Sequence, residues 1–177
     1  MRFRATKIGG VFEVEADPRA DSRGSFARIF CTDEFAAAGI DFTTAQINLS
    51  GNAQRHTLRG MHYQDPPYAE AKLVRAVKGR AFDVVVDLRR DSPTHKQWIA
   101  VELDAAKMNA VFVPEGCAHG FLTLEDGTDI LYQMGRHFVD GQGKGVRWND
   151  PAFGIAWPGN PAVISPRDAN DYPDYAF

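Results

Sequence analysis

The sequence has little cysteine and no long apolar segment, and both absences narrow the classes of protein that it can encode. Cys31 and Cys117 are the only cysteines among 177 residues, so neither a disulfide framework nor a cysteine-based metal site is expected. No apolar run is long enough to span a bilayer, and residues 1–5 lack the apolar core of a signal peptide. We therefore expect a cytoplasmic protein with two free thiols and no membrane partner.

An excess of positive charge is also missing. The formal net charge is -3, whereas a general nucleic-acid binder is usually basic. Apolar residues make up 44% of the chain and charged residues 24%, which is ordinary globular composition. With no internal repeat, low-complexity segment or linker, residues 1–177 are predicted to form a single domain.

What the chain does contain is a succession of short apolar runs separated by turn signals rich in Gly, Pro and Asp. The nearly continuous apolar run 81–88 is typical of a strand that is buried on both faces. Many short strands at this spacing favour an all-β fold: an antiparallel sandwich, jelly roll or barrel. The strands predicted from residue 42 onward are 42–50, 57–64, 72–78, 80–89, 97–103, 109–113, 118–124 and 128–138.

Before residue 42 the pattern is more varied. Residues 11–15 and 25–30 are expected as strands, with residues 17–24 as a polar loop between them. Residues 32–39 predict one short helix, with Thr32 as N-cap and Gly39 as the stop signal. Past Gly145 the chain is expected to form a tail of short extended pieces.

The segment 58–64 (LRGMHYQ) carries the first sign of chemistry. Arg59 and His62 flank Gly60 and Met61, and in a regular strand two such positions face opposite sides. The two side chains can share a face only if the backbone bends at Gly60, which glycine permits. A guanidinium binds anions such as phosphate, and an imidazole transfers protons near neutral pH.

A second histidine, His119, follows a tight turn in the segment 114–121 (PEGCAHGF). Two strand histidines raise the possibility of a metal, but Gln64 stands where a metal-binding cupin usually has a second histidine. Two histidines without a further ligand make a poor metal site, so no metal is predicted. His119 could also be a core histidine bonded to backbone.

Taken in order, the motifs resemble those of the dTDP-4-dehydrorhamnose 3,5-epimerase family, which are metal-free cupins that act on nucleotide sugars. The resemblance extends from about Arg23 to Asp168. It is carried by residues 21–26 (DSRGSF), 46–50 (QINLS), 58–64 (LRGMHYQ), 71–75 (AKLVR), 82–89 (FDVVVDLR), 113–121 (VPEGCAHGF), 131–132 (LY) and 147–151 (RWNDP).

The resemblance implies a cupin-type antiparallel jelly roll and an epimerase that needs no cofactor. The substrate implied is a nucleoside diphosphate 4-keto-6-deoxy sugar, whose ketone acidifies the protons on C3 and C5. By resemblance, His62 would be the base and Asp168 its orienting partner. Tyr132 would return the proton from the opposite face, and Lys72 would stabilise the enolate.

Other matching positions fall on the substrate and on the assembly. The resemblance implies a homodimer in which Arg23 reaches the neighbouring subunit's site. The remaining positions expected at the substrate are Phe26, Gln46, Asn48, Arg59, His119 and Phe138.

Two departures from the family pattern leave the exact reaction open. Arg28 stands where the family usually has a glutamate near the nucleotide, so the nucleotide preference is undetermined. Phe138 replaces a second tyrosine, so the enzyme could invert C3 or C5 alone. The sequence is also compatible with a related 4-keto sugar isomerase, a metal-dependent cupin oxygenase or a non-catalytic sugar-binding cupin.

Overall fold

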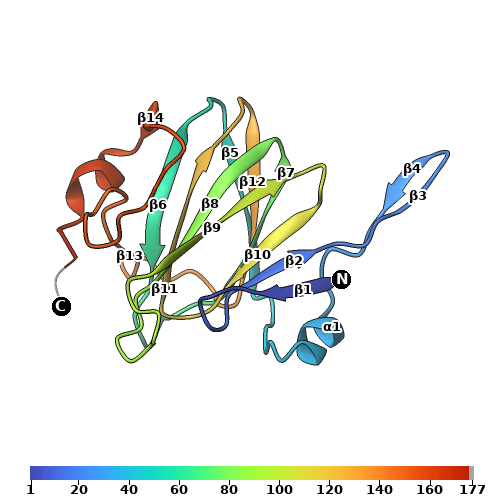
Figure 1. The fold of residues 1–177 in the computed structure, drawn as a ribbon, viewed down its shortest axis with the longest axis horizontal. Coiled ribbons are helices and arrows are strands. Elements are labelled where there is room, and N and C mark those ends of the chain that lie inside the picture. The colour runs from blue at the N-terminus through green and yellow to red at the C-terminus, as the bar shows by residue number, and fades with distance from the viewer. Residues whose placement is uncertain (176–177) are drawn as a thin grey trace.

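The computed structural model describes residues 1–175 and consists mostly of two facing β-sheets (Figure 1). The first sheet has the strand order β1-β2-β10-β7-β12-β5, and the second has the order β13-β6-β11-β8-β9, with β14 beside β6. Neighbouring strands are antiparallel, except that β14 runs parallel to β6. This arrangement is an antiparallel jelly roll, as predicted.

The strands agree closely with those expected from the sequence, with differences at their ends. From residue 42 to residue 138 they are β5 Gln46–Asn52, β6 Thr57–Tyr63, β7 Lys72–Lys78, β8 Arg80–Asp87, β9 Trp98–Asp104, β10 Asn109–Val113, β11 Cys117–Thr123 and β12 Thr128–Met134. The main errors are at residues 42–45 and 135–138, which are not in strands.

The ends of the chain depart further from the prediction. The first pair of strands is β1 (Arg2–Ala5) with β2 (Phe12–Glu15), and β1 was not predicted. In place of the expected loop 17–24 and strand 25–30 there is a short hairpin of β3 (Arg19–Asp21) and β4 (Gly24–Phe26). Residues 27–30 are not in a strand. Its turn forms because Asp21 Oδ1 accepts a hydrogen bond from the Arg23 backbone N–H at 2.8 Å, a local bond typical of Asp in turns.

The predicted helix is present as α1 (Thr32–Ala37), but its N-cap is Cys31 rather than Thr32. The extended backbone of Cys31 supplies the first carbonyl, and no side chain caps the helix. Gly39 has φ +77° and its N–H bonds to the Ala36 carbonyl, so the predicted glycine stop is confirmed. Within the described residues, no helix has the length and apolar character that a membrane span requires.

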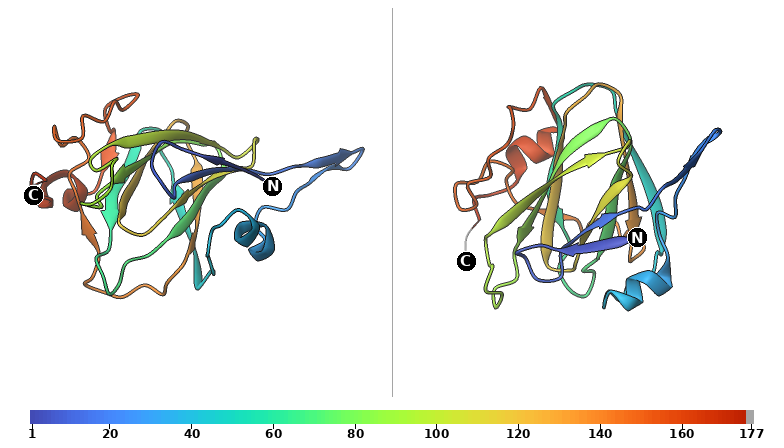
Figure 2. Two further views of the ribbon diagram at one scale, coloured as in Figure 1. Left: turned by 60° about the horizontal axis from the view of Figure 1, so that its bottom comes forward. Right: turned by 45° about the vertical axis from the view of Figure 1, so that its right-hand side comes forward.

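The tail after Gly145 is extended in part, as expected, but it also contains a π-helical turn, η1 (Arg167–Asp171). Two short pieces, β13 (Lys144–Gly145) and β14 (Val163–Ile164), join the second sheet, both against β6. The tail therefore covers one side of the jelly roll, while the β3–β4 hairpin projects from the opposite side (Figures 1 and 2).

Alternation along the strands divides the core into three layers. Val74, Val85 and Phe121 lie between the sheets. Leu73 packs with Phe35 of α1 outside the first sheet, and Val84 and Val86 pack under the tail outside the second. Because β8 is covered on both sides, its predicted double burial is confirmed.

The backbone bends at Gly60, which is the condition under which Arg59 and His62 can share a face. His62 lies opposite His119 and Arg59 opposite Phe121, so β6 advances three residues where β11 advances two. This extra residue is a β-bulge. Gly60 has φ +143°, and a Cβ there would lie 2.5 Å from the Gly120 Cα. The close approach of β6 to β11 therefore requires glycine at position 60. The bulge places the Arg59 and His62 side chains on the same cavity.

Candidate active site

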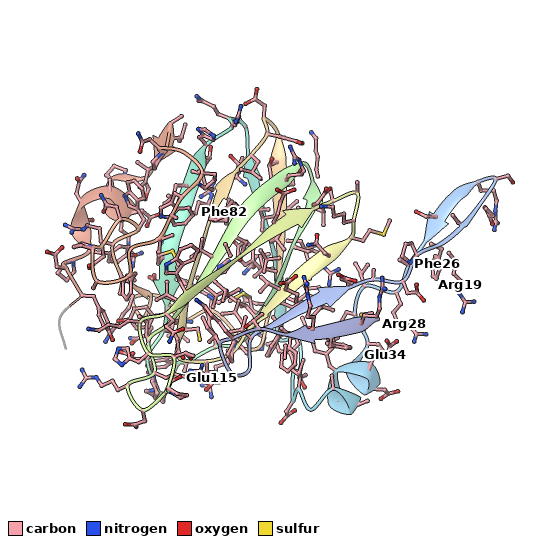
Figure 3. All side chains as sticks on the ribbon, viewed as in Figure 1. Arg19, Phe26, Arg28, Glu34, Phe82 and Glu115 are labelled. Atoms are coloured by element: carbon pink, nitrogen blue, oxygen red, sulfur yellow. The ribbon has the colours of Figure 1, made fainter. Side chains whose placement is uncertain are left out.

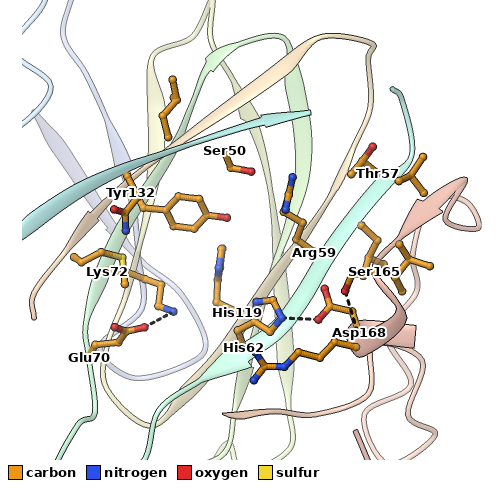
Figure 4. A pocket seen from close by; sticks show the side chains of 17 residues that line it. Ser50, Thr57, Arg59, His62, Glu70, Lys72, His119, Tyr132, Ser165 and Asp168 are labelled. Carbon is orange, nitrogen blue, oxygen red and sulfur yellow. Dashed lines mark hydrogen bonds and ion pairs between the residues drawn. The ribbon is translucent and has the colours of Figure 1, made fainter. Parts of the chain in front are cut away.

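A cavity of about 640 Å³ opens between the two sheets, beside η1 (Figure 4). Both sheets and the C-terminal tail contribute to its wall. The cavity brings together most of the predicted site residues: Asn48, Arg59, His62, Lys72, His119, Tyr132 and Asp168.

Four predicted substrate-binding residues do not line this cavity. Arg23 and Phe26 lie on the projecting β3–β4 hairpin, where the exposed fractions are 88% for the Arg23 side chain and 79% for Phe26. Figure 3 shows Phe26 at the base of this hairpin. Arg23 pairs with Asp21 at 2.6 Å. Gln46 lies at the start of β5 and accepts a hydrogen bond from the backbone N–H of Phe138, whose ring is exposed.

His62 and Asp168 form a hydrogen-bonded pair at one side of the cavity. His62 Nε2 lies 2.7 Å from Asp168 Oδ1, and the His62 side chain is 44% exposed. The Gly60 backbone N–H donates to Asp168 Oδ2 at 3.3 Å. Burial raises the pKa of Asp168, but the bonds from His62, Gly60 and Ser165 outweigh it and hold that pKa below its ordinary value. Asp168 therefore stays ionised and orients the imidazole.

Tyr132 enters the cavity from the facing sheet. It lies on β12 of the first sheet, whereas His62 lies on β6 of the second. Figure 4 shows its hydroxyl directed into the cavity, away from the strand. Burial raises the pKa of Tyr132, so the phenol is protonated at neutral pH and can act as an acid.

Lys72 has a carboxylate partner that the sequence reading missed. Glu70 Oε1 lies 3.2 Å from Lys72 Nζ, and both side chains are almost fully buried on the cavity wall. Gln64 Nε2 donates to Glu70 Oε2 at 2.6 Å. Glu70 stands two residues before Lys72, a spacing that places extended residues on one face, so alternation could have identified it.

His119 also has a partner that the sequence reading missed. Its Nε2 lies 2.8 Å from Asp83 Oδ2, and both residues are buried. Asp83 is one of two acids, with Asp87, inside the mostly apolar run 81–88. A buried acid needs a partner, and that signal was available in the sequence. His62 and His119 thus bond different carboxylates, and within residues 1–175 no three His, Cys, Asp or Glu side chains are grouped to hold a metal ion.

Several further polar side chains line the cavity. Arg59 Nε donates to Asn52 Oδ1 at 2.9 Å, which leaves much of the guanidinium exposed. Further polar lining residues that the sequence reading missed are Ser50, Thr57, Ser165 and Arg167. They come from segments that meet only in the folded chain.

Comparison with known proteins places the chain among sugar-nucleotide epimerases. A family model described as dTDP-4-dehydrorhamnose 3,5-epimerase matches residues 5–174. A dTDP-4-dehydrorhamnose 3,5-epimerase from Sinorhizobium fredii is 37% identical over 171 residues, which cover 96% of this chain and 88% of the relative. A dTDP-4-dehydrorhamnose 3-epimerase from Streptomyces niveus is 40% identical over 169 residues, which cover 95% of this chain and 81% of the relative.

The fold agrees with a solved structure from the same group. A dTDP-4-dehydrorhamnose 3,5-epimerase from Bacillus anthracis, with TDP and PPi bound, superposes with a TM-score of 0.94 at 33% identity. The match covers 98% of this chain and 99% of the solved one.

Proposed function

Because this chain belongs to the dTDP-4-dehydrorhamnose 3,5-epimerase family, we propose that it inverts both C3 and C5 of its sugar. The reaction converts dTDP-4-dehydro-6-deoxy-D-glucose to dTDP-4-dehydro-L-rhamnose. That the chain is an epimerase follows from the family; the two carbons, the residue roles and the mechanism are the proposal.

One observation carries the proposed mechanism: a base and an acid enter the same cavity from facing sheets. His62, with Asp168 bonded to its Nε2 at 2.7 Å, comes from the second sheet, and Tyr132 comes from the first. Inverting a carbon beside a ketone requires removal of a proton from one face of the ring and its return to the other. A sugar ring between His62 and Tyr132 would present one face to each.

Each inversion consists of two proton transfers, one from the sugar to His62 and one from Tyr132 to the sugar. His62 takes the proton from C3 or C5, and the C–H electron pair moves into an enolate with its charge on the C4 oxygen. Tyr132 then donates its phenolic proton to the opposite face of the carbon, and the ketone re-forms. Asp168 holds the imidazole by its Nε2 and stabilises the imidazolium between the two transfers.

Lys72 supplies the positive charge that an enolate requires. Its ammonium lines the cavity and bonds to Glu70 at 3.2 Å, which keeps a buried cation paired. Its other N–H groups remain for the C4 oxygen. A donor placed where charge develops is worth about 10²–10³-fold in rate.

The remaining cavity residues suit the nucleotide and sugar. Arg59 at the rim presents a guanidinium that matches a diphosphate. Asn48 and His119 are proposed to bind the sugar and nucleotide. Gln46 does not line the cavity but is proposed to join them, since its Nε2 donates a hydrogen bond to Asn48 Oδ1 at 3.2 Å.

We further propose a homodimer in which the β3–β4 hairpin serves the neighbouring site. Arg23 and Phe26 are exposed on a hairpin that projects from the body of their own chain. Neither residue lines the cavity of that chain. A projecting hairpin with an arginine in its turn and an exposed aromatic ring at its base is suited to a site on a second subunit.

Inversion of C3 alone is the second candidate, since the Streptomyces niveus relative is a 3-epimerase at 40% identity. Phe138 retains an aromatic ring but has no hydroxyl to bond the sugar.

Arg28 bears on the choice of nucleotide, because it places a cation where the family usually has a glutamate. Its guanidinium pairs with Glu34 at 2.8 Å (Figure 3).

Proton NMR in heavy water, with dTDP-4-dehydro-6-deoxy-D-glucose, tests the proposal. Solvent deuterium marks each carbon that is deprotonated, and we expect the C3 and C5 signals both to disappear. Exchange at C3 alone would replace the proposal with the 3-epimerase. Absence of exchange would contradict the substrate, and the same experiment with other nucleotides would then test the position of Arg28.

A further inference from the structure

The cavity wall contains a second histidine–carboxylate pair that the proposed proton transfers do not use. His119 and Asp83 lie on the adjacent strands β11 and β8, and His119 Nε2 is 2.8 Å from Asp83 Oδ2. The Asp83 side chain is fully buried and that of His119 is 3% exposed. By contrast, the His62 side chain is 44% exposed.

The bond to Asp83 decides which His119 nitrogen faces the cavity. Nε2 is occupied by the carboxylate, so Nδ1 is the nitrogen left for a ligand. Within residues 1–175, Nδ1 has no protein hydrogen-bond partner, and His119 lines the cavity. Its chemistry toward a ligand depends on whether Nδ1 carries a proton.

Charge balance around the pair favours a proton on Nδ1. Burial raises the pKa of Asp83, while His119 and Lys72 oppose that rise. Lys72 already has Glu70 as its partner, so an ionised Asp83 beside a neutral His119 would leave a negative charge without its own counter-charge. A buried charge without a partner is costly. One proton shared between Oδ2 and Nε2, with a second on Nδ1, makes the pair neutral.

The position of His119 indicates which ligand oxygen it meets. It lies directly opposite His62 in the β11–β6 pairing, and its ring centroid is 5.9 Å from that of Tyr132. It is therefore close to both the proposed base and the proposed acid, beside the space where the reacting carbons and their ketone would lie. Arg59, at the rim, is placed for the diphosphate instead.

We infer that Asp83 is a positioning residue, which holds His119 with its Nδ1–H directed into the cavity as a hydrogen-bond donor to the C4 oxygen. The inference rests on the proposed function, because it gives the enolate a second donor beside Lys72. The two histidine pairs then have different tasks. The pair of His62 takes part in the proposed proton transfer, and the buried pair of His119 donates a hydrogen bond.

The tautomer of His119 is the first test, measured by NMR on the free enzyme with ¹⁵N-labelled histidine. A His119→Gln variant identifies the resonances. We expect the ¹⁵N resonances to identify Nδ1 of His119 as the nitrogen that carries a proton toward the cavity, with Nε2 bonded to Asp83. An Nδ1 without a proton would overturn the inference. Because this measurement needs no substrate, it separates the inference from a failure of the proposed reaction.

Kinetics of Asp83→Asn provide the second test. We expect kcat to fall by about 10²-fold while the dissociation constant for dTDP stays unchanged. Asp91→Asn, an exposed acid in the turn after β8, is the matched control. In a His119→Gln background the Asp83 change should cause little further loss, because Asp83 acts through His119. Weaker dTDP binding with unchanged kcat, or an additive loss, would contradict the inference. If Asp83→Asn does not fold, the NMR result decides.

Discussion

At the scale of single residues, the site separates two side chains that differ mainly in solvent access. His62 lies beside an ionised carboxylate with nearly half of its side chain exposed, so it can gain and lose a proton. Tyr132 is placed on the facing sheet, where burial raises the pKa of its phenol. One group is thus suited to take a proton and the other to hold a proton until a stronger base, the enolate carbon, appears.

This difference predicts the outcome of Tyr132→Phe. The base is intact, so solvent deuterium should still enter the substrate from the His62 face. Inversion should fall by about 10²–10⁴-fold, because no acid remains on the opposite face. NMR of the deuterated sugar distinguishes exchange with retention from exchange with inversion.

Tyr63→Phe is the matched control, since Tyr63 is adjacent to His62 on β6 but does not line the cavity. Its inversion rate should equal that of the wild type. Inversion at the wild-type rate in Tyr132→Phe would remove Tyr132 from the mechanism.

At the scale of elements, the turn that links β8 to β9 is organised by one buried acid. Asp87 is fully buried at the end of β8 and accepts hydrogen bonds from Arg89 Nε at 2.8 Å, Ser92 Oγ at 2.5 Å and Thr94 Oγ1 at 2.7 Å. Burial raises the pKa of Asp87, but these donors outweigh it and lower the pKa to about 2. The turn therefore depends on an ionised carboxylate.

The low pKa predicts an acid limit to stability. A carboxyl whose pKa is lower in the folded state stabilises the fold above its unfolded pKa, and that contribution is lost as the pH falls through the folded value. From an unfolded pKa of about 3.9 to about 2 in the fold, the loss is about 2 kcal/mol. Urea unfolding of the wild type between about pH 5 and about pH 2 should show it.

Asp87→Asn should be less stable than the wild type at neutral pH and should lack this part of the pH dependence. Asp91→Asn, in the exposed part of the same turn, should keep it. A wild-type pH dependence in Asp87→Asn would assign the acid sensitivity to other carboxylates.

At the scale of the whole molecule, the proposed dimer predicts that two inactive variants restore activity when their subunits are mixed. If Arg23 serves the neighbouring cavity, a subunit with Arg23→Ala and a subunit with His62→Ala can form a mixed dimer. One of its two sites then carries both defects, and the other carries neither. Random reassortment of the two inactive variants should restore about a quarter of the wild-type activity.

Activity after co-refolding of the two variants tests this expectation, and each variant refolded alone is the control. Asp168→Ala mixed with His62→Ala should restore nothing, because these two residues are paired within one chain at 2.7 Å. Recovery in that second mixture, or none in the first, would contradict an arginine shared between subunits.

Local pattern by itself determined most of the fold. Alternation and turn residues predicted the strands from β5 to β12 and the double burial of β8, because each depends on neighbouring residues in the chain. The sequence also identified Gly60 as the residue that permits a bend between Arg59 and His62. The ordered motifs also predicted the residues that converge on the cavity, including His62, Lys72, His119 and Tyr132. The errors, at β1, the β3–β4 hairpin and η1, lie where a segment is ordered by a turn or by the body of the protein.

Only the tertiary structure decided the partners of the charged groups. Asp83 and Glu70 are ordinary acids in the extended chain, and they acquire a role because folding buries them beside His119 and Lys72. Asp168 reaches His62 across 106 residues of sequence. A charge that is solvated in the extended chain needs a partner once it is buried, and which partner it meets depends on how the two sheets and the tail pack.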